Sequence, residues 1–223
     1  SIERAVDDIV AAFERGHRLR YVGAGTSGRL GVLDASEAPP TFGVDEEVVH
    51  GIIAGGDPAL RRSIEGAEDD SGAGARAARE HVRAGDVLVG ISASGRAKFV
   101  TAAMVMAREL GARTVALTCD AASPLAKDAD IAIAVDVGPE ILAGSSRLKA
   151  GTATKLVLNM LSTAAMIRSG RTRGDLMVDL RPTNAKLRER AVRMVRDEAG
   201  VSEDEARARL ERADWSVRRA LES

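Results

Sequence analysis

The sequence is poor in several features that mark particular classes of protein. It has one cysteine, Cys119, so no disulfide bond within the chain can stabilise the fold. Its first residues do not form the charged segment followed by an apolar stretch that is typical of a signal peptide. Aromatic residues make up only 2% of the chain, too few for a platform that stacks nucleic-acid bases. The longest apolar runs are far too short to span a bilayer. We therefore expect a cytoplasmic protein that binds neither nucleic acid nor membranes.

An excess of charge of one sign is also missing, since 32 Lys and Arg oppose 33 Asp and Glu. No overall field attracts a polyanion, so any site for an anion must be local, and a small molecule is the expected partner. The three histidines, His17, His50 and His81, lack the spacing of metal ligands, and we expect surface or structural roles for them.

Five apolar runs of strand length are present, with helix-like segments between them. The runs cover residues 18–24, 48–55, 86–93, 113–119 and 131–137. Because they are rich in β-branched residues and nearly continuous, they predict strands that are buried on both faces, as in a parallel sheet. Residues 96–110 carry apolar side chains at helical spacing and end at Gly111, which completes a strand–helix–strand unit. This alternation predicts an α/β fold.

Helical patterns follow the fifth run. Residues 146–170 predict one long helix that is apolar almost all round its middle, so we expect it to be buried. Residues 183–198 and 202–222 predict further helices, and Ser202 and Glu205 have the spacing of a capping box.

The chain of 223 residues is long enough for one main domain with an appendage. Because charge rises sharply near the C-terminus, we divide it into a main domain, residues 1–180, and a small C-terminal helical tail, residues 181–223. We expect the tail to be a solvated helical hairpin rather than a module that binds a partner.

Two similar glycine loops follow two of the predicted strands. The first reads GAGTSG at residues 23–28 and looks like a dinucleotide-binding loop, but no acidic residue ends the next strand about 20 positions later. The second reads GISASGR at residues 90–96. Short hydroxyls and backbone N–H groups at a helix N-terminus suit a phosphate monoester, so a phosphorylated metabolite is predicted. The other interpretation is that the hydroxyls only cap helices. The residues that we assign to phosphate binding are Gly25, Thr26, Ser27, Ser92, Ser94 and Gly95.

Several blocks of sequence, taken together, resemble one family. The blocks are GAGTSGRLGVLDASEAPPTFG (23–43), IIAGGDPALRRSIEGAEDD (52–70), ISASGR (91–96), VGPEILAGSSRLKAGTATKLVLNMLST (137–163) and LMVDLRPTN (176–184). From about residue 18 to residue 190 the chain resembles the N-acetylmuramic acid 6-phosphate etherases, a branch of the sugar isomerase (SIS) domain superfamily.

The resemblance implies a fold, an activity and an assembly. The fold is a flavodoxin-like three-layer α/β sandwich with a five-stranded parallel sheet, and the protein is a homodimer without a metal or an organic cofactor. The activity is that of a lyase, which cleaves the D-lactyl ether of N-acetylmuramic acid 6-phosphate to N-acetylglucosamine 6-phosphate and D-lactate. The resemblance maps the catalytic acid and base to Glu37 and Glu68. We assign Glu37 as the acid for the leaving lactate oxygen and Glu68 as the base at C2, and the two roles can be exchanged.

The residue patterns support these two carboxylates unequally. Pro39 and Pro40 should end the preceding helix, which would hold the Glu37 side chain at a break in the backbone. Glu68 lies in an acidic run, which without the resemblance would indicate hydrated surface.

Three more charged residues are candidates for binding the substrate. Glu140 follows the fifth strand, at the carboxyl edge where open α/β sheets bind ligands, and otherwise it is a charged loop residue. Arg147 and Lys149 begin the long helix and could meet a phosphate or the lactate carboxylate, or they could lie along the surface.

The chain departs from the family pattern in two places, and two other functions remain possible. Arg96-Ala97-Lys98 stand where the family usually has a threonine and a proline, and the chain begins close to its first helix. An isomerase that interconverts aldose and ketose phosphates would use the same loops, and so would a phosphosugar sensor without catalytic activity. The DASEAPPTFG and EGAEDD blocks argue against the isomerase, and an acid–base pair is not needed by a sensor.

Overall fold

The structure is a computed structural model and describes residues 1–180 and 182–222. Its strands are β1 (Leu19–Gly23), β2 (Val49–Ile53), β3 (Val87–Ile91), β4 (Arg113–Thr118) and β5 (Ile131–Ala134). Its α-helices are α1 (Ile2–Glu14), α2 (Gly25–Phe42), α3 (Ser71–His81), α4 (Lys98–Glu109), α5 (Pro124–Asp128), α6 (Lys149–Arg168), α7 (Ala185–Ala199), α8 (Glu203–Arg212) and α9 (Val217–Leu221). Short 3₁₀ helices lie at η1 (Asp57–Leu60) and η2 (Ala67–Asp69).

The packing divides the chain into two compact units. The first unit comprises Ser1–Ser36 and Glu46–Ala165, and the second comprises Glu37–Asp45 and Met166–Ser223. Helix α2 therefore begins in the first unit and ends in the second.

The first unit is built on a five-stranded sheet in the order β2-β1-β3-β4-β5, with every neighbouring pair parallel. All residues of β1 and β3 are buried, as the continuous apolar runs predict for strands covered on both faces. The five predicted strands and their parallel arrangement are thus confirmed.

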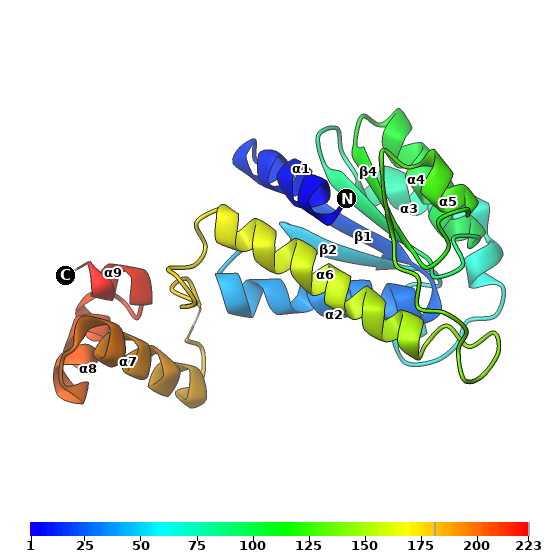
Figure 1. The fold of residues 1–223 in the computed structure, drawn as a ribbon. Helices are drawn as coiled ribbons and strands as arrows, with labels where there is room; N and C mark the ends of the chain where they lie inside the picture. The colour runs from blue at the N-terminus through cyan, green and yellow to red at the C-terminus, as the bar shows by residue number, and fades with distance from the viewer. Residues whose placement is uncertain (181, 223) are drawn as a thin grey trace. The chain divides into compact units, whose positions relative to one another are not determined.

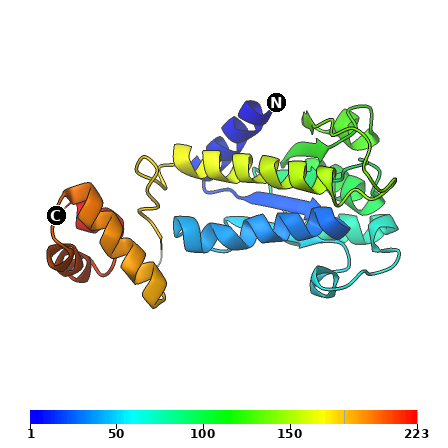
Figure 2. The same cartoon turned by 60° about the horizontal axis from the view of Figure 1, so that its bottom comes forward.

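Helices cover both faces of this sheet, which gives three layers (Figure 1). On one face, α3, α4 and α5 bury Val22 and Leu88 of the sheet against Phe99, Val100 and Leu125. On the other face lie α1, α2 and α6; Figure 2 looks onto α2 and α6, which run side by side with the sheet behind them. The predicted three-layer α/β sandwich is confirmed.

Helices α2 and α6 are joined by a buried carboxylate. Asp34 accepts hydrogen bonds from the Tyr21 hydroxyl at 2.8 Å, from the Asn159 amide at 2.8 Å and from the Ser162 hydroxyl at 3.2 Å. Burial, followed by the charge of Asp34, raises the pKa of Tyr21 well above its usual value, so the phenol stays a donor. Three donors satisfy the buried charge and fix the two helices against β1.

The C-terminal part of the second unit is a cluster of three helices with its own core. Val192 and Val195 of α7 pack against Leu210 of α8 and Val217 of α9. The Ser202 hydroxyl accepts a hydrogen bond from the Glu205 N–H at 3.2 Å, which is the predicted cap of α8. The predicted helical tail is confirmed as a set of helices.

Two predictions about helices are wrong. Helix α2 does not end before Pro39 but continues through Pro40 to Phe42. The two prolines lie in its last turn, where their fixed φ suits a helix, and the helix ends two residues after Pro40 although the hydrogen bonds to the preceding turn are missing at both prolines. The long helix α6 is buried on one side only, because the exposed fractions of Leu156 and Met160 are 49% and 50%.

No described helix combines the length and the apolar character that a membrane crossing requires.

Candidate functional site

The two glycine loops leave the sheet at the same level of its carboxyl edge. Strands β1 and β3 are neighbours, and their last residues, Gly23 and Ile91, pair in register. Because both strands point the same way, the loops that follow them start side by side. The first-unit structure therefore brings together the two segments that were predicted to bind phosphate.

The first loop forms the start of α2. Gly25, Thr26 and Ser27 are the first residues of this helix, so their N–H groups have no acceptor within it. Within the described part of the chain, the hydroxyls of Thr26 and Ser27 make no hydrogen bond either. The Thr26 methyl group lies close to the start of α6, 3.6 Å from the position of a β-carbon built on Gly151. Unpaired N–H groups and free hydroxyls at a positive helix end suit a phosphate.

The second loop is fastened to the end of β4. The carbonyl of Ala93 accepts hydrogen bonds from the Thr118 hydroxyl at 3.1 Å and from the Cys119 N–H at 2.9 Å. Gly95 has a φ of +63°, and a β-carbon there would overlap the hydroxyl of Ser123. Glycine is therefore required at this position, and the loop has one well-defined path.

The hydroxyls of the second loop do not cap the helix that follows. Helix α4 has Ala97 at its N-cap, and no side chain caps it. Among the residues that the structure describes, the Ser94 hydroxyl accepts one local hydrogen bond, from the Arg96 N–H at 3.3 Å, and its side chain is exposed. Ser92 is buried, with 6% of its surface exposed. For α4, helix capping therefore does not explain why these two serines are present.

The segment that carries Glu68 lies beside the second loop. Glu68 is on η2, which packs against α4, and the carboxylate of its neighbour Asp69 is 3.5 Å from the ammonium of Lys98 at the start of α4. Asp70 caps α3 by accepting a hydrogen bond from the Ala73 N–H at 2.8 Å. The Glu68 side chain is exposed and makes no hydrogen bond within the described residues. Its carboxylate is thus unengaged, and its catalytic role stays a prediction.

Glu140 occupies the N-terminus of α6. Its carboxylate accepts hydrogen bonds from the N–H groups of Ala150 at 2.9 Å and Lys149 at 3.0 Å. These bonds, chiefly the one from the Ala150 N–H, lower the pKa of Glu140. The pKa of Cys119 is raised, mainly by burial and also by the negative charges of Glu140 and Asp136. Both oxygens are therefore engaged in fixing the loop before α6, and its assignment as a binding residue stays a prediction.

Two cations flank this helix start. Arg147 and Lys149 are exposed, and neither forms an ion pair with a described residue. A β-carbon built on Gly138 would be 3.7 Å from the Lys149 ammonium, so this side chain turns back over the loop that carries Glu140. Both cations remain available to an anionic group.

Glu37 belongs to the second unit. It lies on α2, two residues before Pro39, and its side chain is exposed. It makes no hydrogen bond within the described residues, as is also true of Glu68. The roles of Glu37 and Glu68 stay predictions.

The sequence reasoning missed Asp34, which stands in the same block as Glu37. Its signal was a charged residue among apolar positions of an expected helix, one turn before Glu37. Such a residue is buried only when donors reach it, and Tyr21 and Asn159 could not be paired with it before the fold was known.

Within residues 1–180 and 182–222, no group of three or more His, Cys, Asp or Glu side chains could hold a metal ion.

Comparison with known domain families and solved structures identifies the class of protein to which this fold belongs. A model of the SIS domain matches residues 70–164, and a model of the glucokinase regulatory protein N-terminal SIS domain matches residues 1–108. A phosphoheptose isomerase from Neisseria gonorrhoeae has the same fold, with a TM-score of 0.55 and 21% identity over 74% of this chain and 84% of that chain. The sugar isomerase domain of an RpiR transcription factor from Sphaerobacter thermophilus matches with a TM-score of 0.51 and 20% identity, over 75% of this chain and 79% of that chain. The chain is an SIS-domain protein.

Curated relatives give the particular family. An N-acetylmuramic acid 6-phosphate etherase of Jannaschia sp. (strain CCS1) is 56% identical over 99% of this chain and 70% of its own length. Etherases of the same name from Symbiobacterium thermophilum and Gloeobacter violaceus are also 56% identical over 99% of this chain, and 73% and 72% of their lengths are covered. This chain belongs to the N-acetylmuramic acid 6-phosphate etherase family.

Proposed function

We propose that this chain is a carbon–oxygen lyase that cleaves the D-lactyl ether of N-acetylmuramic acid 6-phosphate and releases N-acetylglucosamine 6-phosphate and D-lactate. The observation that carries the proposal is the pair of hydroxyl-bearing loops at one edge of the sheet, with a free carboxylate, Glu68, on a segment beside the second loop. The family relationship supports the same activity.

The phosphate of the sugar is bound by the two loops. The N–H groups at the start of α2 and the hydroxyls of Thr26, Ser27, Ser92 and Ser94 supply donors for its three outer oxygens. Gly25 and Gly95 let the backbone come close to the phosphate. The site then holds the sugar by its 6-phosphate and leaves C1 to C3 to the carboxylates.

The chemistry begins with opening of the sugar ring, which exposes an aldehyde at C1 and makes the C2 proton acidic. A base removes that proton, the electron pair forms a C2–C3 double bond, and the C3–oxygen bond breaks. The lactate oxygen takes a proton from an acid as it leaves. Water then adds to the double bond, placing a hydroxyl at C3 and a proton at C2. Every atom of the ether is accounted for, and no external oxidant or reductant is required.

Two carboxyl groups perform these proton transfers. We assign Glu68 as the base at C2 and Glu37 as the acid for the lactate oxygen, and exchanging them leaves the chemistry unchanged. Arg147 and Lys149 are proposed to meet the lactate carboxylate, because neither has an ion-pair partner among the described residues. Glu140 is proposed to hold the start of α6 in place for this contact.

We propose that the protein works as a homodimer in the cytoplasm. Leu33 of α2 and Met160 of α6 are each next in sequence to one member of the hydrogen-bonded pair Asp34–Asn159, and both are about half exposed, at 51% and 50%. Leu156, one turn before Met160, is exposed to the same degree, and we propose that a second copy covers these apolar side chains. A sugar phosphate carries negative charge that does not cross a bilayer unaided, so its enzyme must share its compartment.

We also keep residues 1–180 as the catalytic domain and residues 181–223 as a separate tail.

Incubation with N-acetylmuramic acid 6-phosphate tests the proposal directly. A lyase releases D-lactate in an amount equal to the N-acetylglucosamine 6-phosphate formed. An isomerase would instead convert an aldose phosphate to a ketose phosphate, and a sensor would bind the phosphosugar without turnover. Either of these outcomes, with no lactate formed, would rule out the proposed activity.

A further inference from the structure

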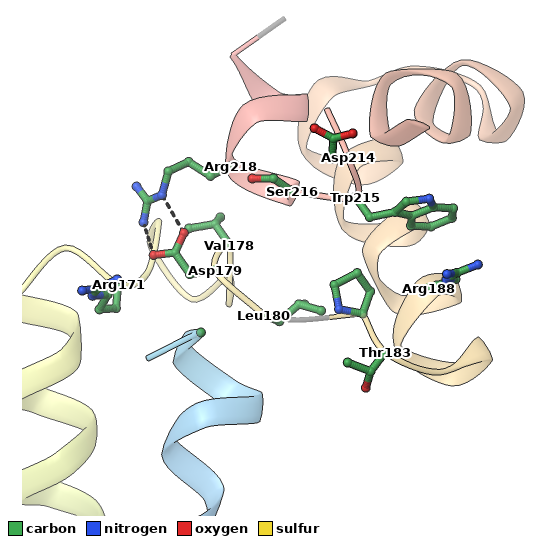
Figure 3. A pocket seen from close by; sticks show the side chains of 12 residues that line it. Arg171, Val178, Asp179, Leu180, Thr183, Arg188, Asp214, Trp215, Ser216 and Arg218 are labelled. Atoms are coloured by element: carbon green, nitrogen blue, oxygen red, sulfur yellow. Dashed lines mark hydrogen bonds and ion pairs between the residues drawn. The ribbon is translucent and has the colours of Figure 1, made fainter. Parts of the chain in front are cut away.

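The sequence block LMVDLRPTN has no part in the chemistry above, yet one of its residues is held firmly. The carboxylate of Asp179 accepts two hydrogen bonds from Arg218 of α9, from Nε at 2.7 Å and from Nη2 at 2.8 Å (Figure 3). The same Nη2 donates to the carbonyl of Gly170 at 2.7 Å. Such a two-point pair is stronger and better defined in geometry than a single surface contact.

The backbone of Asp179 also rests on the end of helix α2. Gly43, the residue after α2, has a φ of +66°, and a β-carbon there would overlap the carbonyl oxygen of Asp179. Only glycine allows this approach, and the Gly43 N–H caps α2 by donating to Pro39 at 3.0 Å. Asp179 therefore links α9 to the segment Glu37–Asp45, and all of these residues lie in the second unit.

The C-terminal end of α2 has fewer backbone hydrogen bonds than an ordinary helix end. Pro39 and Pro40 have no N–H, so the last turn lacks the two hydrogen bonds that they would donate to residues one turn earlier. Glu37 lies in that weakened stretch, and its side chain makes no hydrogen bond within the described residues. Its orientation therefore depends on what packs against the helix end.

The pocket around Asp179 does not offer an alternative explanation as an anion site. It has a volume of about 690 Å³ and includes Gly43, Asp179, Trp215 and Arg218 in its walls. Most of its charged side chains already have partners: Arg218 pairs with Asp179, Asp214 pairs with Arg219 at 3.2 Å, and the Arg188 guanidinium lies 5.0 Å from the centre of the Trp215 ring. Figure 3 shows Arg171 and Arg188 at opposite ends, so they do not converge on one ligand.

We infer that Asp179 and Arg218 are positioning residues for Glu37, and that the C-terminal helices act on the reaction by fixing the end of helix α2. The inference rests on the proposed function, because it assumes that Glu37 transfers a proton. It assigns the LMVDLRPTN block a role in orienting a reacting group rather than in binding the phosphosugar.

The matched pair Arg218→Ala and Arg219→Ala tests the inference. Both arginines lie on α9 and pair with an aspartate, but Arg219 pairs with Asp214 in an exposed ion pair, whereas Arg218 pairs with Asp179. We expect Arg218→Ala to lower kcat for lactate release by about tenfold or more, with KM within about twofold, because misplaced reacting groups lose rate rather than binding. Hydrogen exchange in residues 37–45 should be faster than in the parent. Arg219→Ala should match the parent in all three measurements.

A second set of variants distinguishes a loss of positioning from a loss of the folded structure. Asp179→Asn keeps the size of the side chain and should lose kcat by several-fold, and Asp179→Ala/Arg218→Ala should lose no more than the worse single variant, as for two residues that act as one unit. The inference would be overturned if Arg218→Ala and Arg219→Ala had equal kcat values. If Arg218→Ala no longer bound the phosphosugar, Asp179→Asn would decide instead, and an unchanged kcat in that variant would overturn the inference. If the parent protein released no lactate, the proposed function would be refuted rather than this inference. Unchanged hydrogen exchange of residues 37–45 in Arg218→Ala would refute the proposed support of the end of α2.

Discussion

Replacing Ser94 with alanine separates phosphate binding from helix capping. Ser94 accepts one local hydrogen bond, at 3.3 Å from the Arg96 N–H, and the helix after it is capped by no side chain. The variant should therefore keep the stability of the parent to within about 0.5 kcal/mol, as exposed substitutions do. In the complex the hydroxyl would instead bond a charged phosphate.

The expected loss of binding follows from that difference. A hydrogen bond to a charged group contributes about 1–3 kcal/mol, which corresponds to an affinity for the phosphosugar lower by about 5–150-fold. Calorimetric titration with N-acetylglucosamine 6-phosphate measures it, and the weaker binding of the unphosphorylated sugar should hardly change.

Ser202→Ala is the matched control, since Ser202 does cap a helix. It should reduce stability by about 0.5–2 kcal/mol and leave phosphosugar binding unchanged. If Ser94→Ala weakened the binding of both sugars equally, or if it destabilised the protein as Ser202→Ala does, Ser94 would not belong to the phosphate site.

Three further predictions concern catalysis, assembly and pH. Glu37→Gln and Glu68→Gln should each lower kcat by about 10²–10⁴-fold with phosphosugar binding retained, and lactate production within about twofold of the parent would refute that residue's assignment. Leu156→Glu should turn a dimer into monomers in sedimentation experiments, because it places a charge on the apolar face of α6; an unchanged mass would exclude that face as the interface. Burial, then the charges of Arg20 and His81, lowers the pKa of His50, so the unfolded chain binds that proton more readily and the melting temperature should fall as the pH drops below about 6.5. His50→Gln should reduce that fall, and an equal fall in both proteins would contradict it.

Much of the sheet could be predicted because its sequence signal is local. A strand covered on both faces has to be apolar at every position, and β1 and β3 meet this condition without help from distant residues. The same holds for the cap of α8, since Ser202 and Glu205 lie within a single turn.

The errors arose where distant packing overrides a local rule. Proline is a reliable helix breaker only inside a helix, and the sequence alone did not show that Pro39 and Pro40 fall in the last turn of α2. The apolar surface of α6 predicted burial, but a single sheet covers one side of a helix, and the other side stays exposed in the chain by itself.

The neighbouring placement of the two loops could be predicted, but the contacts that support the candidate site could not. Hydroxyls and glycines after neighbouring strands carry their own chemical signal, so Gly25 to Ser27 could be proposed as phosphate ligands directly, and that role stays a prediction. Two of the three partners of Asp34, Asn159 and Ser162, come from helix α6, more than 100 positions away. The partners of Glu140 come from the start of the same helix, about ten positions away. Pairings of this kind become visible only in the fold.

Turnover in ¹⁸O-labelled water tests the central claim most directly. Elimination followed by addition of water takes the new C3 oxygen from the solvent and leaves the original ether oxygen in lactate. In deuterium oxide, C2 of the product should also gain deuterium. Unlabelled product incubated with the enzyme corrects for exchange of the C1 oxygen through the open-chain aldehyde. The account predicts that mass spectrometry finds ¹⁸O at C3 of the sugar and none in lactate, whereas ¹⁸O in the lactate hydroxyl would show displacement at the lactate carbon and would contradict Glu68 as the base at C2.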